Sequence, residues 1–157
     1  PGETEGIEAE CTADILVDAG IPEFYVPDAG QRIDLYRRIA LVRTDDDASD
    51  LIDELADRYG DIPKSVHALV RIALLRSAAG LLGISEISQK ESHLNLTIVK
   101  PDIKTISLLC SEKRYKGRLF FSAVERPYLS LRINNGSDVL REAELLVKGL
   151  RDHSEKA

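Results

Sequence analysis

The sequence has little of what catalytic and metal centres are built from. Its 157 residues include no methionine, no tryptophan, two cysteines and three histidines. Cys11 and Cys110 lack metal-ligand spacing and are typical of small buried residues in a reducing, cytoplasmic protein. His67, His93 and His153 fall in separate predicted segments, so no pattern brings two of them together. The sequence therefore predicts neither a metal site nor histidine-based catalysis.

Three motifs that would indicate other functions are also missing. The chain contains no G-x-x-x-x-G-K-[ST] loop to bind phosphates and no G-x-S-x-G segment to present a nucleophilic serine. No stretch approaches the roughly 20 apolar residues of a membrane span. We therefore expect a soluble domain that has no enzymatic activity, binds no cofactor and does not associate with membranes.

The composition is that of an ordinary globular protein, with 43% hydrophobic and 31% charged residues. A chain of 157 residues suits a single domain. We expect that domain to cover 9–152, between a tail or linker remnant at 1–8 and a tail at 153–157. The start at Pro1-Gly2 and the lack of methionine predict a fragment of a longer protein. The net charge of −6 disfavours general binding to nucleic acid and favours positively charged partners.

Hydrophobic periodicity divides the chain into helices and strands. A period of 3.6 predicts helices over 28–43, 45–59 and 63–82, a helix that begins at Pro101, and a last helix that begins at Ser137 or Asp138. A period of two predicts a strand over 10–18 and hairpins that pair 84–88 with 94–99 and 118–124 with 128–133. The predicted fold class is α+β, with an antiparallel sheet built from two hairpins and an N-terminal strand and packed against a helical layer.

Polar residues mark where the predicted helices begin and end. Asp28 with Gln31, and Thr44 with Asp47, are spaced for a capping box at a helix start. Gly60 can take the left-handed conformation that ends the helix over 45–59. These signals predict a sharp and rigid corner between the second and third helices.

The apolar pattern also predicts which side chains are buried. We expect two apolar stripes to cover the helix over 63–82, with only Lys64, His67 and Arg71 exposed and with small residues at 78–80 allowing another backbone to approach. The residues expected inward on the other helices are Ile33, Leu35, Tyr36, Ile39, Val42, Ile103, Ile106, Leu109, Cys110, Val139, Leu140, Ala143, Leu146, Val147 and Leu150.

One helix carries the main candidate for function. Four carboxylates and one arginine share a broad face of the helix over 45–59, namely Asp50, Asp53, Glu54, Asp57 and Arg58. Such a face is either a solvated surface with internal pairing, such as Glu54 with Arg58 four residues later, or a docking surface for a basic patch. Sequence spacing alone leaves both interpretations open.

Three other charged segments were candidates for chemistry. The stretch 53–57 resembles the acidic end of a nucleotide-hydrolysis motif, but it lies in the middle of a predicted helix. The carboxylates at 45–47 could collect a divalent cation, although consecutive acids at a helix start usually serve as caps. The basic run Lys113, Arg114, Lys116 and Arg118, with Tyr115 within it, would suit single-stranded nucleic acid or form a solvated loop.

Four segments together resemble a known family. They are AGIP at 19–22, YVPD at 25–28, RIDLYRRIA at 32–40 and ELADRYGDIP at 54–63. In this order they resemble the C-terminal domain of bacterial transcription-repair coupling factor. The similarity extends through LGI at 82–84 and less distinctively to Ile133.

The resemblance implies a non-catalytic module of an ATP-dependent DNA translocase that acts in transcription-coupled nucleotide excision repair. In that family, domains that precede this one bind ATP and Mg, move on double-stranded DNA, recognise stalled RNA polymerase and recruit the UvrA repair protein. The C-terminal domain folds back on the chain's own UvrB-like N-terminal domain, where it masks UvrA binding and restrains the motor. The resemblance therefore implies autoinhibition in the cytoplasm.

The resemblance also assigns contact residues. The E-x-x-D-R part of the family motif corresponds to Glu54, Asp57 and Arg58, which lie on the charged face described above. Asp50 and Asp53 share that face and are expected to extend the interdomain interface.

Overall fold

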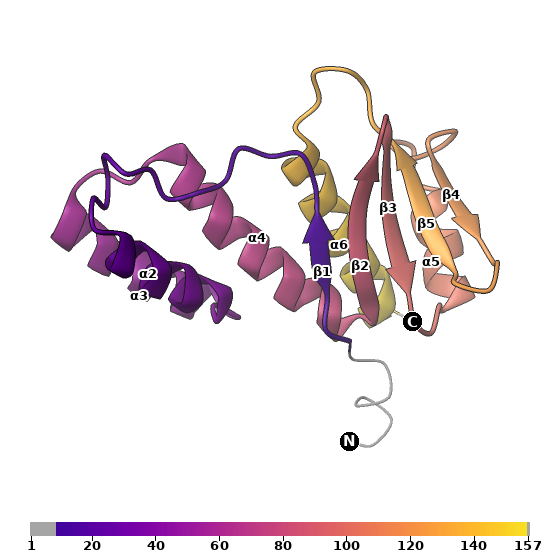
Figure 1. The fold of residues 1–157 in the computed structure, drawn as a ribbon. Coiled ribbons are helices and arrows are strands. Elements are labelled where there is room, and N and C mark those ends of the chain that lie inside the picture. The colour runs from indigo at the N-terminus through magenta and orange to yellow at the C-terminus, as the bar shows by residue number, and fades with distance from the viewer. Residues whose placement is uncertain (1–8, 157) are drawn as a thin grey trace. The chain divides into compact units, whose positions relative to one another are not determined.

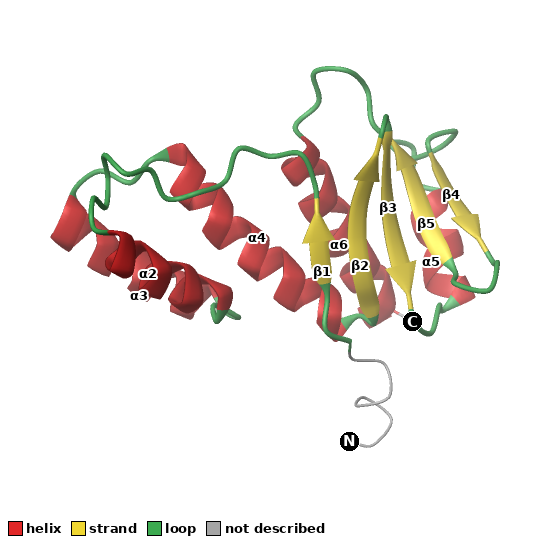
Figure 2. Ribbon diagram, in the orientation of Figure 1, coloured by secondary structure: helices red, strands yellow, loops and turns green. Residues whose placement is uncertain are grey.

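The fold is described from a computed structural model, which describes residues 9–156. The expected tail at 1–8 lies outside the described residues. Along the chain the elements are β1 (Thr12–Asp14), α2 (Ala29–Ala40), α3 (Asp45–Tyr59), α4 (Lys64–Leu81), β2 (Ile84–Lys90), β3 (His93–Ile98), α5 (Ile103–Cys110), β4 (Leu119–Ser122), β5 (Tyr128–Arg132) and α6 (Val139–Lys156) (Figure 1). Their types agree with the hydrophobic periods of the sequence (Figure 2). No helix among the described residues is both long enough and apolar enough to cross a membrane.

The chain forms two compact units. One unit spans 17–77 and holds α2, α3 and most of α4, whereas the other combines residues 9–16 with residues 78–156 and holds the sheet, α5 and α6. The helix α4 therefore begins in the first unit and ends in the second.

The second unit is built on a five-stranded sheet in the order β1-β2-β3-β5-β4. The α+β class, the two hairpins and the N-terminal strand are confirmed. The sheet is mixed rather than purely antiparallel, because β1 pairs parallel with β2. No tight turn joins these two strands, since the whole segment 17–77 lies between them, and so no hairpin imposes an antiparallel direction.

The sheet has one apolar face and one polar face. Leu94 and Leu96 of β3 and Leu129 and Leu131 of β5 are fully buried, and the residues between them point the other way. The helices α5 and α6 lie on one face of the sheet (Figure 1). The inward residues predicted for α6 are buried, except that Val139 is half-buried at its start.

Three details of this unit differ from prediction. Ile103, the first residue of α5, is exposed, whereas Ile106 one turn later is buried. Leu81 at the end of α4 is exposed as well. The helix α6 continues through Lys156, so residues 153–156, expected as tail, are helical.

The small residues at the end of α4 behave as predicted. The Ala9 amide donates to the Gly80 carbonyl at 2.8 Å, and a Cβ at Gly80 would collide with the Ala9 carbonyl oxygen. A glycine at this position therefore lets the chain before β1 pass directly against the helix.

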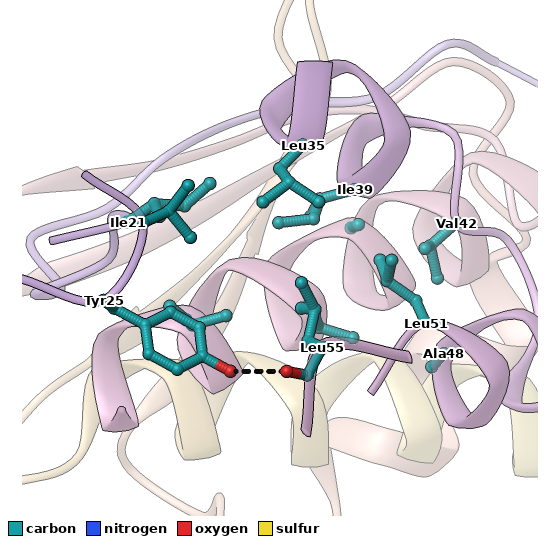
Figure 3. Packing of buried hydrophobic residues seen from close by; sticks show 12 residues of the cluster. Ile21, Tyr25, Leu35, Ile39, Val42, Ala48, Leu51 and Leu55 are labelled. Carbon is teal, nitrogen blue, oxygen red and sulfur yellow. Dashed lines mark hydrogen bonds between the residues drawn. The ribbon is translucent and has the colours of Figure 1, made fainter. Parts of the chain in front are cut away.

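The first unit has its own core, formed where α2, α3 and α4 meet the segment before α2 (Figure 3). Its buried members are Ile21, Tyr25, Val26, Leu35, Ile39, Val42, Ala48, Leu51, Leu55, Val66, Val70 and Ala73. Ile33 and Tyr36 were predicted to join them and are exposed instead. Only Leu35 and Ile39 are buried within α2, so its inward stripe is narrower than the pattern suggested.

The boundaries of α3 follow the predicted signals. Thr44 and Asp47 form the reciprocal capping box, and Gly60 ends the helix with φ 87°. The Tyr25 hydroxyl lies 3.2 Å from the Leu55 carbonyl and 3.0 Å from the Gly60 carbonyl, so it links the end of α3 to the segment before α2. At α2, the Asp28 carboxylate accepts from the Gln31 backbone amide as predicted, whereas the Gln31 side chain accepts from the Tyr59 hydroxyl instead of completing the predicted capping box. The corner after α3 is therefore held by side-chain hydrogen bonds as well as by glycine.

We predict that Leu55→Ala destabilises the first unit. Leu55 is 1% exposed at the centre of its core, and a truncation of this kind costs about 2–5 kcal/mol of unfolding free energy. Denaturant unfolding followed by circular dichroism measures the change. Ile33→Ala, on the exposed side of α2, is the control and should cost less than about 0.5 kcal/mol. Equal losses in the two variants would contradict the described packing.

Candidate functional site

The candidate site is the outward face of α3. The helix buries Ala48, Leu51 and Leu55, which turns the intervening positions toward solvent. The structure places all five sequence-predicted residues on that side, with Asp50, Asp53, Asp57 and Arg58 exposed and Glu54 partly covered. We call these five residues, together with Arg38, the charged face.

Glu54 is held by two arginines from different helices. Its carboxylate accepts from both terminal nitrogens of Arg38 on α2, at 2.6 and 2.8 Å, and lies 3.6 Å from Nη1 of Arg58. The hydrogen bonds from Arg38 hold the pKa of Glu54 below its ordinary value, and the same pairing raises the pKa of Arg38. The four-residue spacing predicted the Glu54–Arg58 pair, whereas Arg38, the closer partner, lies on another helix and was not predicted.

Arg58 is oriented by an aromatic neighbour. Its guanidinium carbon lies 5.0 Å from the centre of the Tyr59 ring, within range of a cation–π contact. The Tyr59 hydroxyl in turn lies 3.1 Å from Oε1 of Gln31 on α2, and its ring packs 5.6 Å from that of Tyr25. Gln31, in the first turn of α2, therefore holds the Tyr59 side chain through a hydrogen bond. Arg58 in turn lies against an aromatic ring that is packed on the core residue Tyr25.

The remaining carboxylates carry uncompensated charge. Asp50, Asp53 and Asp57 form no ion pair with any residue that the structure describes. With four carboxylates and two guanidinium groups, the charged face has a net charge of −2. Such a face attracts a cationic surface. Its exposed groups stay hydrated as long as no partner is bound.

A shallow groove borders the charged face and supplies an apolar contact. It is lined by Arg38, Leu41, Val42, Asp47, Asp50, Leu51 and Glu54. Leu41, just past the end of α2, is 68% exposed although it is a large aliphatic residue. Leu41 was not among the residues expected to point inward, although the helix was expected to continue past it to residue 43. The arrangement can accept a basic side chain together with its aliphatic stem.

The acidic start of α3 is used in capping. The Asp47 carboxylate accepts from the backbone amides of Arg43 and Thr44, and these bonds hold its pKa below the ordinary value. This is the capping role that sequence reasoning favoured over a cation site.

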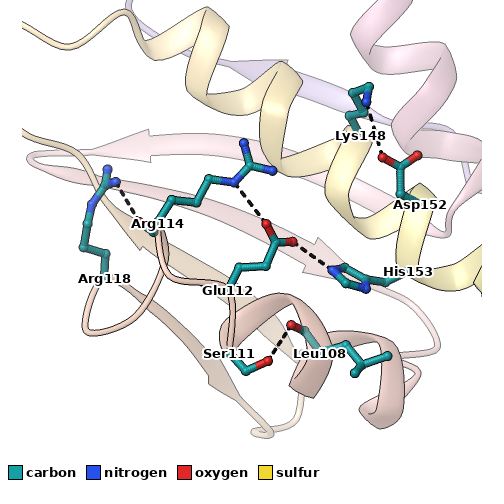
Figure 4. A network of polar contacts seen from close by, with 8 residues as sticks. All are labelled: Leu108, Ser111, Glu112, Arg114, Arg118, Lys148, Asp152 and His153. Atoms are coloured by element: carbon teal, nitrogen blue, oxygen red, sulfur yellow. Dashed lines mark hydrogen bonds and ion pairs between the residues drawn. The ribbon is translucent and has the colours of Figure 1, made fainter.

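The basic run before β4 does not present an aromatic platform, and Figure 4 shows the Arg114 side chain of that run directed at Glu112. Tyr115 is only 2% exposed, so its ring cannot stack on a base, and burial raises the pKa of its hydroxyl. Arg114 pairs with Glu112 at 3.2 Å, and Arg118 pairs with Glu142 at 3.0 Å. The nucleic-acid alternative therefore lacks its stacking residue, because Tyr115 packs inward although its neighbours in the sequence are cations.

The chain is similar to a defined group of known proteins. The family model for the TRCF domain matches residues 15–107. The transcription-repair-coupling factor of Bacillus subtilis is 38% identical over 95 residues, which is 60% of this chain and 8% of the relative. That of Staphylococcus aureus is 29% identical over 126 residues, 78% of this chain and 10% of the relative. The chain thus spans a tenth or less of the length of these relatives.

A solved structure shares the fold. It is the crystal structure of the C-terminal domain of a transcription-repair coupling factor, which superposes with a TM-score of 0.76 at 20% identity. The match covers 96% of this chain and 97% of that one. At this identity the likeness establishes the fold.

The pairing of Glu54 predicts how stability changes in acid. Because its folded pKa lies below the unfolded value of about 4.5, the pair stabilises the domain above that pH and is lost as pH falls through the folded pKa. As the pH falls below 5, the unfolding free energy of Glu54→Gln should therefore decrease less than that of the parent chain. Denaturant titration at several pH values measures both. Asp53→Asn is the control, since Asp53 forms no ion pair, and its slope should match the parent. The assignment fails if both variants keep the parent slope.

Proposed function

Since this chain belongs to the TRCF domain family, we propose that it is a non-catalytic regulatory domain of a transcription-repair coupling factor. In this proposal the parent protein is an ATP-dependent DNA translocase of the cytoplasm that contacts RNA polymerase, UvrA and double-stranded DNA. The domain docks on the parent's own UvrB-like domain, masks UvrA binding there and restrains the motor.

The observation that carries the proposal is the charged face. Its matched motif residues, Glu54, Asp57 and Arg58, are all accessible on one side of α3. Asp57 has no partner for its charge among the described residues, whereas Glu54 is fixed by Arg38. The face therefore combines a rigid, oriented centre with free acidic groups around it, which is how a surface recognises arginines or lysines on a partner.

The face also fits the energetic needs of a releasable contact. Docking within one chain is governed by the effective concentration that the tether sets, on the order of 1 mM. The ratio of the effective concentration to the Kd of the contact sets the population of the docked state. A Kd about tenfold below the effective concentration therefore keeps the docked state about 90% populated. Exposed ion pairs supply contacts of this modest strength, whereas a large apolar interface would hold the domain too tightly to release.

The proposal of a non-catalytic role rests on the chemistry of this face. Within the described part of the chain, its titratable groups are exposed carboxylates and guanidinium groups, with no serine, cysteine or lysine nucleophile set beside a base. Such groups suit binding through charge rather than covalent chemistry. In this proposal the domain blocks UvrA by occupying the surface that UvrA would bind. ATP and Mg are bound by other domains of the parent.

We predict that Glu54→Lys combined with Asp57→Lys, made in the full-length parent, opens the docked state. Reversing two charges converts attraction to a basic partner into repulsion, so UvrA should bind about tenfold more tightly if the docked state was about 90% populated. Basal ATP hydrolysis should rise as well. Binding is measured by surface plasmon resonance and hydrolysis by phosphate release.

The matched control carries the same charge change elsewhere. Asp18→Lys with Glu155→Lys reverses two exposed carboxylates that lie outside α3, and it should leave both readouts at parental values. Circular dichroism of both double variants confirms folding. UvrA affinity that is unchanged in the α3 variant while its fold is intact would refute the docking proposal.

A further inference from the structure

The strand β4 is a short outer edge of the sheet, four residues long. It is the last strand in the order β1-β2-β3-β5-β4, and among the described residues it pairs with β5 alone. The stretch 119–124 contains no charged residue and no proline, and Phe120 and Val124 are each 58% exposed. Edge strands usually carry a charge, a proline or a cover that prevents pairing with another chain. The sequence of β4 lacks the first two of these devices.

Backbone hydrogen bonds show which groups of β4 point outward. The Arg132 amide donates to the Arg118 carbonyl at 2.9 Å. The backbone N–H and C=O groups of the even-numbered residues of β4 therefore point toward β5, and those of the odd-numbered residues point away from it. The Ile98 amide donates to the Pro127 carbonyl at 2.9 Å. The backbone groups of the odd-numbered residues of β5 therefore point toward β3 and those of the even-numbered residues toward β4, which agrees with the first assignment. The outward groups are therefore the Leu119 carbonyl, the Phe121 amide and carbonyl, and the Ala123 amide.

The Leu119 amide is already used, since it donates to the Tyr115 carbonyl at 2.9 Å. The free edge thus offers two donors and two acceptors in the spacing of a β-ladder. This is the pattern that an added strand requires.

The charges beside β4 indicate what kind of strand fits. Lys113 and Lys116 are exposed just before it and form no ion pair with any described residue. The two arginines of the same run are neutralised by Glu112 and Glu142. The N-terminal end of the edge is therefore the end that favours carboxylates.

We propose that the outer edge of β4 binds an extended, uncharged segment of a partner protein that is followed by acidic residues. The segment adds to the sheet antiparallel to β4, which continues the direction of the β5–β4 pair. In that direction the partner's carboxyl-terminal part lies beside Lys113 and Lys116. Alternate apolar side chains of the segment lie next to Phe120, while the backbone supplies the hydrogen bonds.

The test uses a fluorescein-labelled peptide of alternating valine and threonine that ends in three glutamates. Fluorescence anisotropy with the 157-residue chain should show saturable binding. The same peptide with all its backbone amides N-methylated should bind at least about tenfold more weakly, because it cannot donate to the edge. A peptide with the glutamates placed first should also bind more weakly, since its charges then lie beside the wrong end of β4.

Two protein variants locate the site. Ala123→Pro removes one outward donor from an exposed position and should weaken the peptide about fivefold. Lys116→Glu should weaken the glutamate peptide and strengthen a matched peptide that ends in lysines. Binding that is unaffected by N-methylation, by Ala123→Pro or by Lys116→Glu would overturn the proposal. So would a concentration-dependent dimer lost in Ala123→Pro without peptide binding, because the edge would then pair with a second copy.

Discussion

The packing of Leu55 beneath Tyr25 decides which side of α3 meets solvent. Leu55 is buried in the core of the first unit, and the Tyr25 hydroxyl lies within hydrogen-bond distance of the carbonyls of Leu55 and Gly60. With that side fixed, the residues at 50, 53, 54, 57 and 58 turn outward together. The capping box at Thr44 and the glycine at the other end hold the helix at both boundaries. The charged face is thus a consequence of core packing.

The Arg38–Glu54 pair is better understood as a positioning device than as a source of stability. Exposed ion pairs contribute little to folding free energy, and both side chains here are about 40% exposed. A bidentate pair does fix the directions of both groups. Glu54 therefore presents one defined geometry between two guanidinium groups, and the uncompensated acids around it give the face its sign. A surface of this kind favours a specific basic partner and keeps the contact sensitive to salt.

Local signals in the sequence were sufficient for the types of the elements and for five of the six residues of the charged face. The capping box of Thr44 and Asp47, the glycine stop and the alternation in β3 depend on neighbouring residues, and the structure agrees with each of them. Arg38 was missed because its bond to Glu54 joins two helices, which no single-helix pattern reveals. Tyr115 was misjudged because its cationic neighbours suggested solvent, although its ring is buried. The parallel pairing of β1 likewise depends on where a distant segment returns to the sheet.

The proposed docking is tested most directly by measuring the association of this chain, at two ionic strengths, with the separately produced UvrB-like domain that we propose as its partner. Calorimetry or anisotropy at about 0.1 M and about 1 M salt compares Debye lengths of about 10 and 3 Å. Docking through the charged face should give a complex at low salt whose Kd rises by about tenfold or more at high salt. The absence of a complex at low salt, or a Kd that does not change with salt, would contradict docking through the charged face.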